Sequence, residues 1–217
     1  RLEGSIELRS LYRIEHVSTR RAMRITSDEE ERQRQGYDMQ TTLQYAQEQG
    51  TLQVTRAMFR SKDGGELLEL HYGPTASVWR INLGWRRRKA KSIFGFNIDV
   101  TTGVWSKDEQ APDDVNDEVD TEGKTIQRIV PYVEDRRNVL VVFPKHDLEE
   151  KDITTLQYAL KRGIEGVFQL EESELMAEPL PSKDKRRAIL FYESAEGGAG
   201  VLTRLATDLK ALSRVAE

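Results

Sequence analysis

Short apolar stretches alternate with compact polar turns through the first half of the chain, a pattern typical of antiparallel β-structure. Strong turn signals interrupt these stretches, among them Ser-Lys-Asp-Gly-Gly at 61–65 and Gly-Pro at 73–74. The pattern predicts strands at 39–46, 52–59, 67–72, 77–83, 93–100 and 103–105. Several strands joined by short turns imply an antiparallel sheet, which could also be barrel-like.

A mixed pattern of strands and helices begins near residue 125. Apolar residues recur at helical spacing along 153–167 and 201–212, so a helix is predicted in each, with Asp152 as the cap of the first. The run 188–192 is almost wholly apolar and predicts a strand buried on both faces. Further strands are predicted at 127–132, 138–143 and 174–180. This order of elements predicts a small α/β layer.

The carboxyl ends of the predicted strands are a candidate binding edge, because ligands favour that edge of α/β layers. If strands 138–143 and 188–192 are parallel neighbours, residues 143–146 and 192–196 lie at one common edge.

A sharply acidic stretch separates the two patterns. Residues 106–124 contain eight acidic residues, two lysines and almost nothing apolar, so a mobile loop or linker is predicted there. An alternative is an acidic segment that shields a basic DNA-binding groove. The predicted organisation is therefore a β-rich part at 1–105, the acidic segment at 106–124 and an α/β domain at 125–217. The fold class is α+β, with an N-terminal antiparallel β-rich part followed by a small α/β layer domain.

A glycine-rich turn joins the buried strand to the last predicted helix. Glycine accepts positive φ and lets another backbone or a ligand come close, and the amides at the following helix start could hold an anion. The spacing matches neither a Walker loop nor a dinucleotide fingerprint, so the glycines could equally serve only to fold the helix back. Two acids flank the turn, either as helix caps or as acid, base or metal ligands. The residues of this turn are Glu193, Glu196, Gly197, Gly198 and Gly200.

The sequence around this turn, FYESAEGGAGVL at 191–202, resembles the signature of a bacterial family of domains of unknown function. That family is the C-terminal, often zinc-binding module of MrfA-type superfamily-two DNA helicases. It also occurs in anti-phage systems such as DISARM (DrmA/DrmB) and Druantia. The core of the resemblance covers 136–212, within which 154–164 resembles the upstream helix of the family. Residues 24–36 resemble the segment that precedes the module in the same helicases.

The resemblance implies DNA as a partner, with helicase motor domains on the same chain or on a partner subunit. The chain contains no cysteine, which excludes disulfides and thiolate metal sites and removes the zinc role of the family. No Walker loop, DEAD-type box or helicase arginine motif is present, so this segment does not carry ATP hydrolysis itself. The histidines are isolated in sequence: His16, His71 and His146. We therefore expect no catalytic residue, metal or cofactor in this segment.

The charge of the chain is unevenly distributed. Residues 1–106 carry 17 Lys and Arg against 13 Asp and Glu, whereas 107–217 carry 16 against 24. A nucleic-acid surface is therefore expected mainly in the first half. Five of the six residues at 86–91 are cations and follow a tryptophan directly, a composition suited to phosphate contacts and base stacking. The candidate DNA-binding residues are Arg20, Arg21, Arg24, Trp85, Arg86, Arg87, Arg88, Lys89 and Lys91. The alternatives are a solvated charged turn at 20–34 and a solvated hairpin tip at 86–91.

No apolar run approaches the length of a membrane span and no signal-peptide pattern is present, so a cytoplasmic protein without membrane contact is expected. The first residue is arginine, which suggests a fragment of a longer protein. The favoured function is an accessory region of a helicase-like protein that contacts DNA and packs against the motor, in anti-phage defence. The alternative is a scaffold module that never touches DNA. A third possibility is a hydrolase that uses Glu193 and Glu196.

Overall fold

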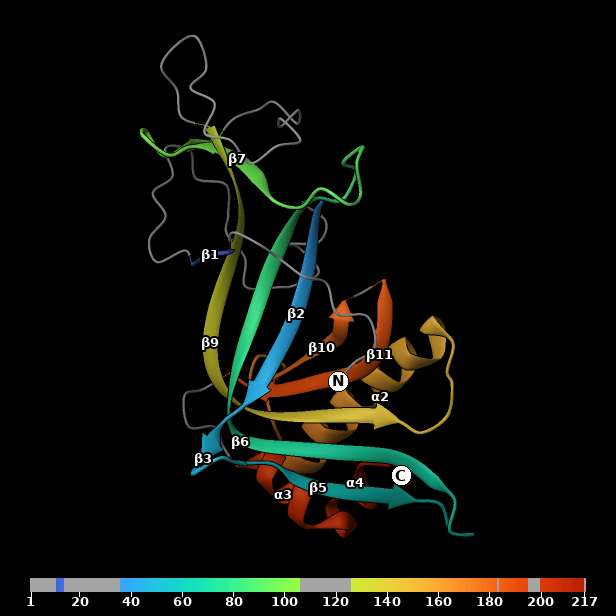
Figure 1. Ribbon diagram of the computed structural model, residues 1–217. Helices are drawn as coiled ribbons and strands as arrows, with labels where there is room; N and C mark the ends of the chain where they lie inside the picture. The colour runs from blue at the N-terminus through green and yellow to red at the C-terminus, as the bar shows by residue number, and fades with distance from the viewer. Residues whose placement is uncertain (1–10, 14–35, 106–125, 183, 195–199, 217) are drawn as a thin grey trace. The chain divides into compact units, whose positions relative to one another are not determined.

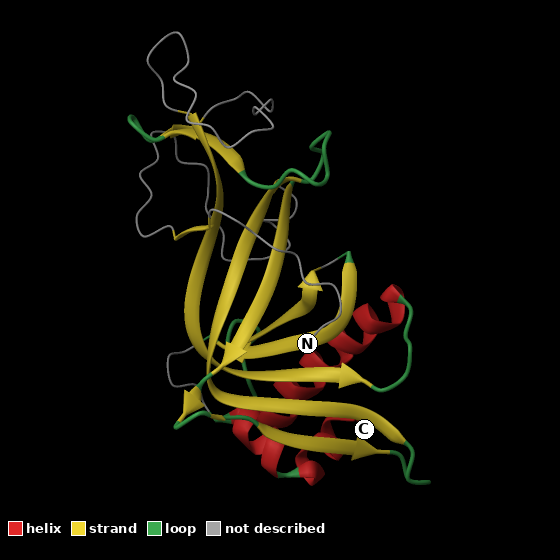
Figure 2. Ribbon diagram, in the orientation of Figure 1, coloured by secondary structure: helices red, strands yellow, loops and turns green. Residues whose placement is uncertain are grey.

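The computed structural model describes residues 11–13, 36–105, 126–182, 184–194 and 200–216 (Figure 1). Some of the predicted features lie outside the described residues: Arg20, Arg21, Arg24, Glu196, Gly197, Gly198 and the acidic segment 106–124. The described residues form mainly antiparallel strands with a few helices (Figure 2). The predicted β-rich α+β fold class is therefore confirmed.

The strands are β1 (Leu11–Arg13), β2 (Tyr37–Tyr45), β3 (Gln47–Glu48), β4 (Thr51–Leu52), β5 (Thr55–Arg60), β6 (Glu66–Trp85), β7 (Phe96–Asp99), β8 (Val104–Trp105), β9 (Ile126–Pro144), β10 (Leu175–Ser182) and β11 (Lys185–Glu193). The described helices are α2 (Glu150–Phe168), α3 (Val201–Thr207) and α4 (Leu209–Ala216).

Long strands organise the sheet, whose main path is β10-β11-β9-β6-β2. Strand β5 pairs with β6, and β7 pairs with both β8 and β9, all in antiparallel fashion. Strand β1 runs parallel to β9, and β3 and β4 form a separate small hairpin. No described helix is both long enough and apolar enough to cross a membrane.

The chain divides into two compact units, each assembled from two stretches of sequence. Unit 1 comprises Arg1–Gln40 and Arg80–Val133, and unit 2 comprises Thr41–Trp79 and Glu134–Glu217. Strands β2, β6 and β9 therefore contribute residues to both units. The domain boundaries at 105 and 125, which were expected from composition, stay a prediction.

Unit 2 has an apolar core on each face of its sheet. On one face the three helices pack against the strands, with Phe191, Leu202 and Leu205 fully buried between them (Figure 2). On the other face Val139, Leu190 and their neighbours form a second core. Residues 188–192 have side chains in both cores, so the predicted strand buried on both faces is confirmed.

The relative direction of β9 and β11 differs from the parallel arrangement on which the expected common edge depends. The two strands are antiparallel, with Ile189 opposite Val142 and Tyr192 opposite Val139. Residues 143–146 and 192–194 are therefore at opposite ends of this strand pair, and the proposed common edge is wrong. The apolar run alone reports burial on both faces but contains no information about strand direction.

The predicted turn at 73–74 is also wrong, because β6 continues through it. Gly73 is required for a close approach instead, since a Cβ at this position would lie 2.6 Å from the ring atom Cδ1 of Tyr45. Strand β9 likewise continues where two strands, 127–132 and 138–143, were expected.

Two helix boundaries differ from the predictions as well. The predicted helix at 201–212 is divided into α3 and α4 at Asp208, whose backbone is extended. The N-cap of α2 is Glu149, and Asp152 lies in the first turn, where a carboxylate favours the positive end of the helix dipole.

Candidate nucleic-acid interface

Four aromatic side chains from four strands meet in unit 1. The rings of Tyr37 and Trp85 are stacked with their centroids 4.7 Å apart. Phe96 packs edge-on against Trp85 at 6.0 Å and against Trp105 at 5.7 Å. Trp85 is nevertheless 43% exposed and Trp105 48% exposed. We call these four residues the aromatic cluster. Its rings pack against part of each indole and leave much of each indole exposed to solvent.

The basic loop, residues 86–95, follows Trp85 directly and connects β6 to β7. Its backbone is fixed at both ends: the Arg86 amide donates to the Gly36 carbonyl, and the Gly95 amide donates to the Leu83 carbonyl. Gly95 has φ +85°, and a Cβ there would lie 2.1 Å from the Ile129 carbonyl oxygen. Only glycine fits where the loop comes this close to the backbone of Ile129. The course of the loop therefore depends on this close approach as well as on its charged residues.

Arg88 is an internal support of the basic loop. Its side chain is only 10% exposed and forms a 2.7 Å ion pair with Asp38. The same guanidinium donates to the carbonyls of Trp85 and Lys91 and lies over the Phe94 ring. The predicted DNA-binding role of Arg88 remains untested, but both terminal nitrogens of this guanidinium already have hydrogen-bond partners within unit 1.

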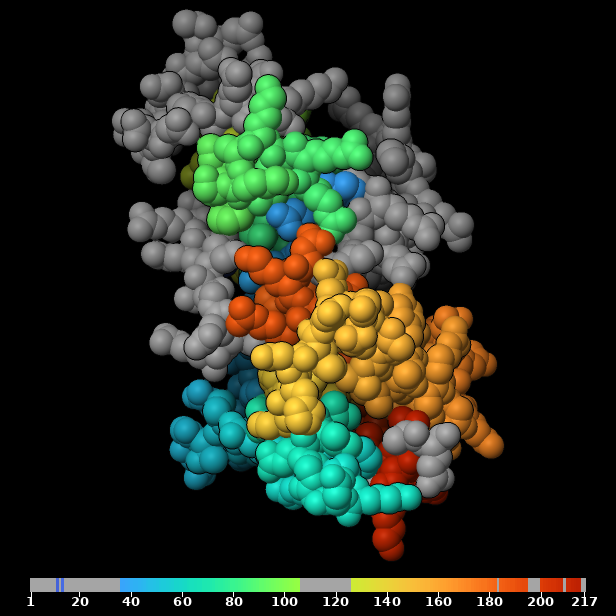
Figure 3. Space-filling model, turned by 90° about the vertical axis from the view of Figure 1, so that its right-hand side faces the viewer, coloured from blue at the N-terminus to red at the C-terminus, as the bar shows by residue number. Residues whose placement is uncertain are grey.

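The other cations of the loop differ in their surroundings. The Lys91 ammonium donates to the Arg86 carbonyl, and Arg86 is half-buried. Arg87, Lys89 and Lys91 are exposed. Figure 3 shows the light-green region around 86–105 at the surface of the molecule. The exposed cations therefore lie in the short loop that begins directly after Trp85.

Sequence reasoning identified Trp85 and the cations but missed Tyr37, Phe96 and Trp105. Tyr37 lies far from Phe96 and Trp105 in the sequence, and the three residues come from three different strands.

Glu193, the acid that precedes the glycine-rich turn of unit 2, is bonded to the start of α3. Glu193 is 2% exposed; its Oε1 accepts a 3.0 Å hydrogen bond from the Val201 amide, and its Oε2 accepts one from the Asn138 side-chain amide. Gly200 has φ +73°, as expected for a glycine that a turn requires. The Val201 amide at the start of α3 is therefore already bonded to a carboxylate and is not open to an external anion. Both oxygens of Glu193 are also engaged, which disfavours a role as base or metal ligand.

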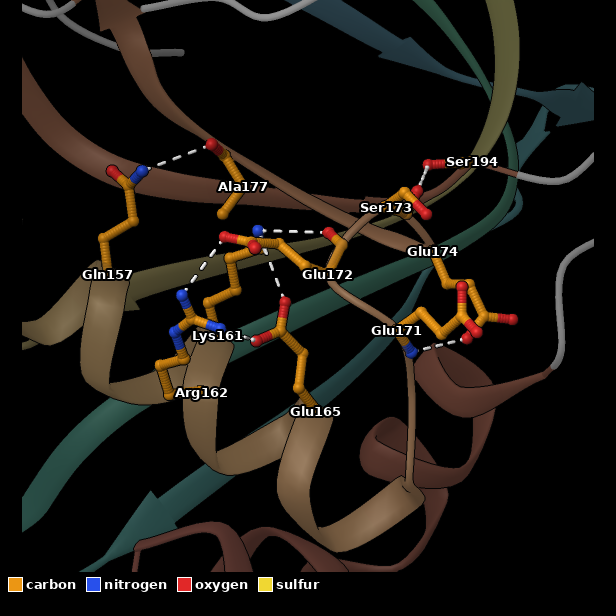
Figure 4. Close-up of polar contacts among 10 residues, drawn as sticks. All are labelled: Gln157, Lys161, Arg162, Glu165, Glu171, Glu172, Ser173, Glu174, Ala177 and Ser194. Carbon is orange, nitrogen blue, oxygen red and sulfur yellow. Dashed lines mark hydrogen bonds and ion pairs between the residues drawn. The ribbon is translucent and has the colours of Figure 1, made fainter.

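The loop between α2 and β10 packs against the same end of β11 (Figure 4). The Ser194 hydroxyl donates to the Ser173 carbonyl, and the Ser194 amide donates to the Glu174 carbonyl. Arg162 of α2 bridges Glu165 of the same helix and Glu172 of the loop. These contacts are internal to unit 2 and connect the loop to α2 and to β11.

Comparison with known proteins finds a similarity for the C-terminal region. Residues 156–217 match the family of the MrfA Zn-binding domain, so this part of the chain is similar to the MrfA-type module. The crystal structure of the DUF1998 helicase MrfA bound to DNA resembles 83% of this chain at 13% identity, with a TM-score of 0.40. The chain spans 20% of that helicase chain. No curated protein matches the sequence significantly.

The side chains of the matched region do not fit a zinc ion. The chain has no cysteine, and residues 156–217 contain no histidine. Within the described part of the chain, no group of three His, Cys, Asp or Glu residues is arranged to hold a metal. Structural zinc sites use four such ligands, mainly thiolates and imidazoles. The donor set that the family name implies is therefore missing here.

Proposed function

We propose that this chain is a helicase-associated accessory region that contacts DNA through the basic loop and the aromatic cluster of unit 1. The observation that carries the proposal is the presence of three exposed cations, Arg87, Lys89 and Lys91, next to two half-exposed tryptophans. Cations of this kind neutralise phosphates, and indoles stack on bases. The similarity of residues 156–217 to the MrfA-type module supports the helicase association.

The arrangement separates two tasks within one loop. Arg88 stabilises the loop from inside through Asp38, so the neighbouring cations can remain at the surface. Like charges crowded on an exposed loop repel one another, and an anionic partner relieves that repulsion. Polyanionic DNA is such a partner, and contacts to its backbone are independent of sequence.

The wider setting follows from the resemblance of the signature at 191–202. The helicase motor domains lie on the same chain or on a partner subunit. The parent protein is a bacterial superfamily-two helicase that binds ATP and acts in the cytoplasm, in an anti-phage system such as DISARM or Druantia. Arg20, Arg21 and Arg24 add further phosphate contacts in this proposal.

Salt-dependent binding tests the DNA contact. The affinity of the full chain for labelled DNA is measured by fluorescence anisotropy at several salt concentrations. Replacing Arg87, Lys89 and Lys91 by alanine should flatten the slope of log affinity against log salt by about two to three units, since each phosphate contact contributes about 0.7–0.9.

The matched control replaces three exposed lysines of unit 2, Lys151, Lys185 and Lys210, and removes the same charge. Equal slopes for the two triple variants would show that only net charge acts. An unchanged affinity and slope in the loop variant would favour the alternative, a scaffold module that holds a defence complex together without touching DNA.

A further inference from the structure

The end of β11 connects three separate parts of unit 2 through one buried carboxylate. Glu193 and Asn138 are the next residues beyond the pair Tyr192–Val139, on β11 and β9 respectively. One carboxylate oxygen binds the Asn138 side chain, and the other binds the backbone amide of Val201, eight residues further along. Glu193 thereby joins β11, β9 and the first residue of α3.

The next residue extends the same connection. Ser194 binds the α2–β10 loop through its hydroxyl and its amide, and its carbonyl accepts a hydrogen bond from Arg137 of β9. Arg137 is oriented in turn by Asp135, whose carboxylate lies 2.7 Å from its Nε. Two consecutive residues thus hold four segments that are distant in sequence.

A structural metal ion has the same mechanical effect, because it ties distant chain segments together and its binding energy becomes folding energy. The matched region lacks the thiolates and imidazoles for such an ion. It does contain the buried Glu193, whose negatively charged carboxylate accepts one hydrogen bond at each oxygen.

We propose that this MrfA-type module is metal-independent, and that the carboxylate of Glu193 supplies the cross-link between β11, β9 and α3 that a structural ion would otherwise supply. This inference concerns unit 2 and stands independently of the DNA contact proposed for unit 1.

The first arm of the test measures metal dependence on the full chain. Elemental analysis of the purified protein should show no stoichiometric zinc. The melting temperature should be the same in buffer, in excess EDTA and with added zinc sulfate. A fall in melting temperature with EDTA, or zinc at one ion per chain, would overturn the proposal.

The second arm measures the cross-link. Glu193→Ala leaves two buried donors without their acceptor, which should lower the melting temperature by about 5–10 °C. Glu193→Gln should lose less, because a flipped Asn138 can accept from the new amide while the remaining oxygen still accepts from Val201. Glu171→Ala removes an exposed carboxylate from the neighbouring loop and should change nothing.

Asn138→Ala provides a milder variant in case Glu193→Ala does not fold. It should lower the melting temperature as well, and the double variant should lose less than the two single losses together, because both remove one shared interaction. If Glu193→Ala melts like Glu171→Ala, or if Asn138→Ala leaves the melting temperature unchanged, Glu193 is no cross-link and the proposal fails.

Discussion

Arg88 and Asp38 form a 2.7 Å ion pair across fifty residues of sequence, with side chains 10% and 28% exposed. The pair connects the start of β2 to the basic loop and leaves Arg88 largely withdrawn from solvent. Its sequence neighbour Arg87 is exposed. Two adjacent arginines of identical chemistry therefore have different surroundings.

Substitution of the two arginines should have different effects. Replacing Arg88 should lower stability, whereas replacing Arg87 should weaken DNA binding. Arg88→Ala should lower the free energy of unfolding by about 1–3 kcal/mol, because it removes charge-assisted hydrogen bonds and leaves Asp38 without its partner. Arg87→Ala should remain within about 0.5 kcal/mol of the parent protein but weaken DNA binding. Urea unfolding and anisotropy measure the two quantities. Equal destabilisation by both substitutions would contradict the internal role of Arg88.

The tryptophans should discriminate between DNA structures. Trp105→Ala should weaken single-strand binding by about 1–3 kcal/mol if an unpaired base stacks on the indole, and should leave duplex binding nearly unchanged. Trp85→Ala should do the same but also lower stability, because it removes the stacking on Tyr37. Tyr158→Ala removes an equally exposed aromatic ring from α2 and serves as the control. Loss of duplex and single-strand affinity in equal measure would argue against stacking.

Two glycines on α2 form a matched pair for stability. A Cβ at Gly163 would lie 2.5 Å from the Val215 carbonyl oxygen of α4, whereas a Cβ at Gly166 would meet nothing within 4 Å. Gly163→Ala should therefore destabilise by about 1–3 kcal/mol because α4 has to shift. Gly166→Ala should stabilise by about 0.5–1 kcal/mol through the better helix propensity of alanine. Thermal unfolding measures both, and a stabilising Gly163→Ala would show that the contact between the helices is loose.

Tyr45 should make the protein sensitive to alkaline pH. Burial raises the pKa of Tyr45 from 10.0 to about 12, and the nearby Arg56 opposes this only in part. The unfolded chain then releases the phenolic proton at a lower pH than the folded chain, so stability falls as the pH rises from 10 to about 12. Tyr45→Phe should lose less stability over this range, as measured by urea unfolding at successive pH values. Identical pH profiles would show that the hydroxyl is solvated in the folded protein.

Local features of the sequence determined several elements correctly. The apolar run 188–192 becomes a strand with side chains in two cores, and the stripe along 153–167 becomes the buried face of α2. Gly200 has the positive φ that its turn requires. Each of these features depends on burial or on backbone freedom at neighbouring positions, which the order of residues reports directly.

Tertiary structure decided which residues meet. Tyr37, Trp85, Phe96 and Trp105 come together only because strand pairing places them side by side. Arg88 of the basic loop is withdrawn from solvent because it pairs with Asp38, which lies on β2. The periodicity of a strand specifies which faces are buried but not its partner, direction or register, because these are selected by contacts between distant segments. For the same reason the charges of the loop were visible in the sequence, whereas the aromatic cluster beside them was not.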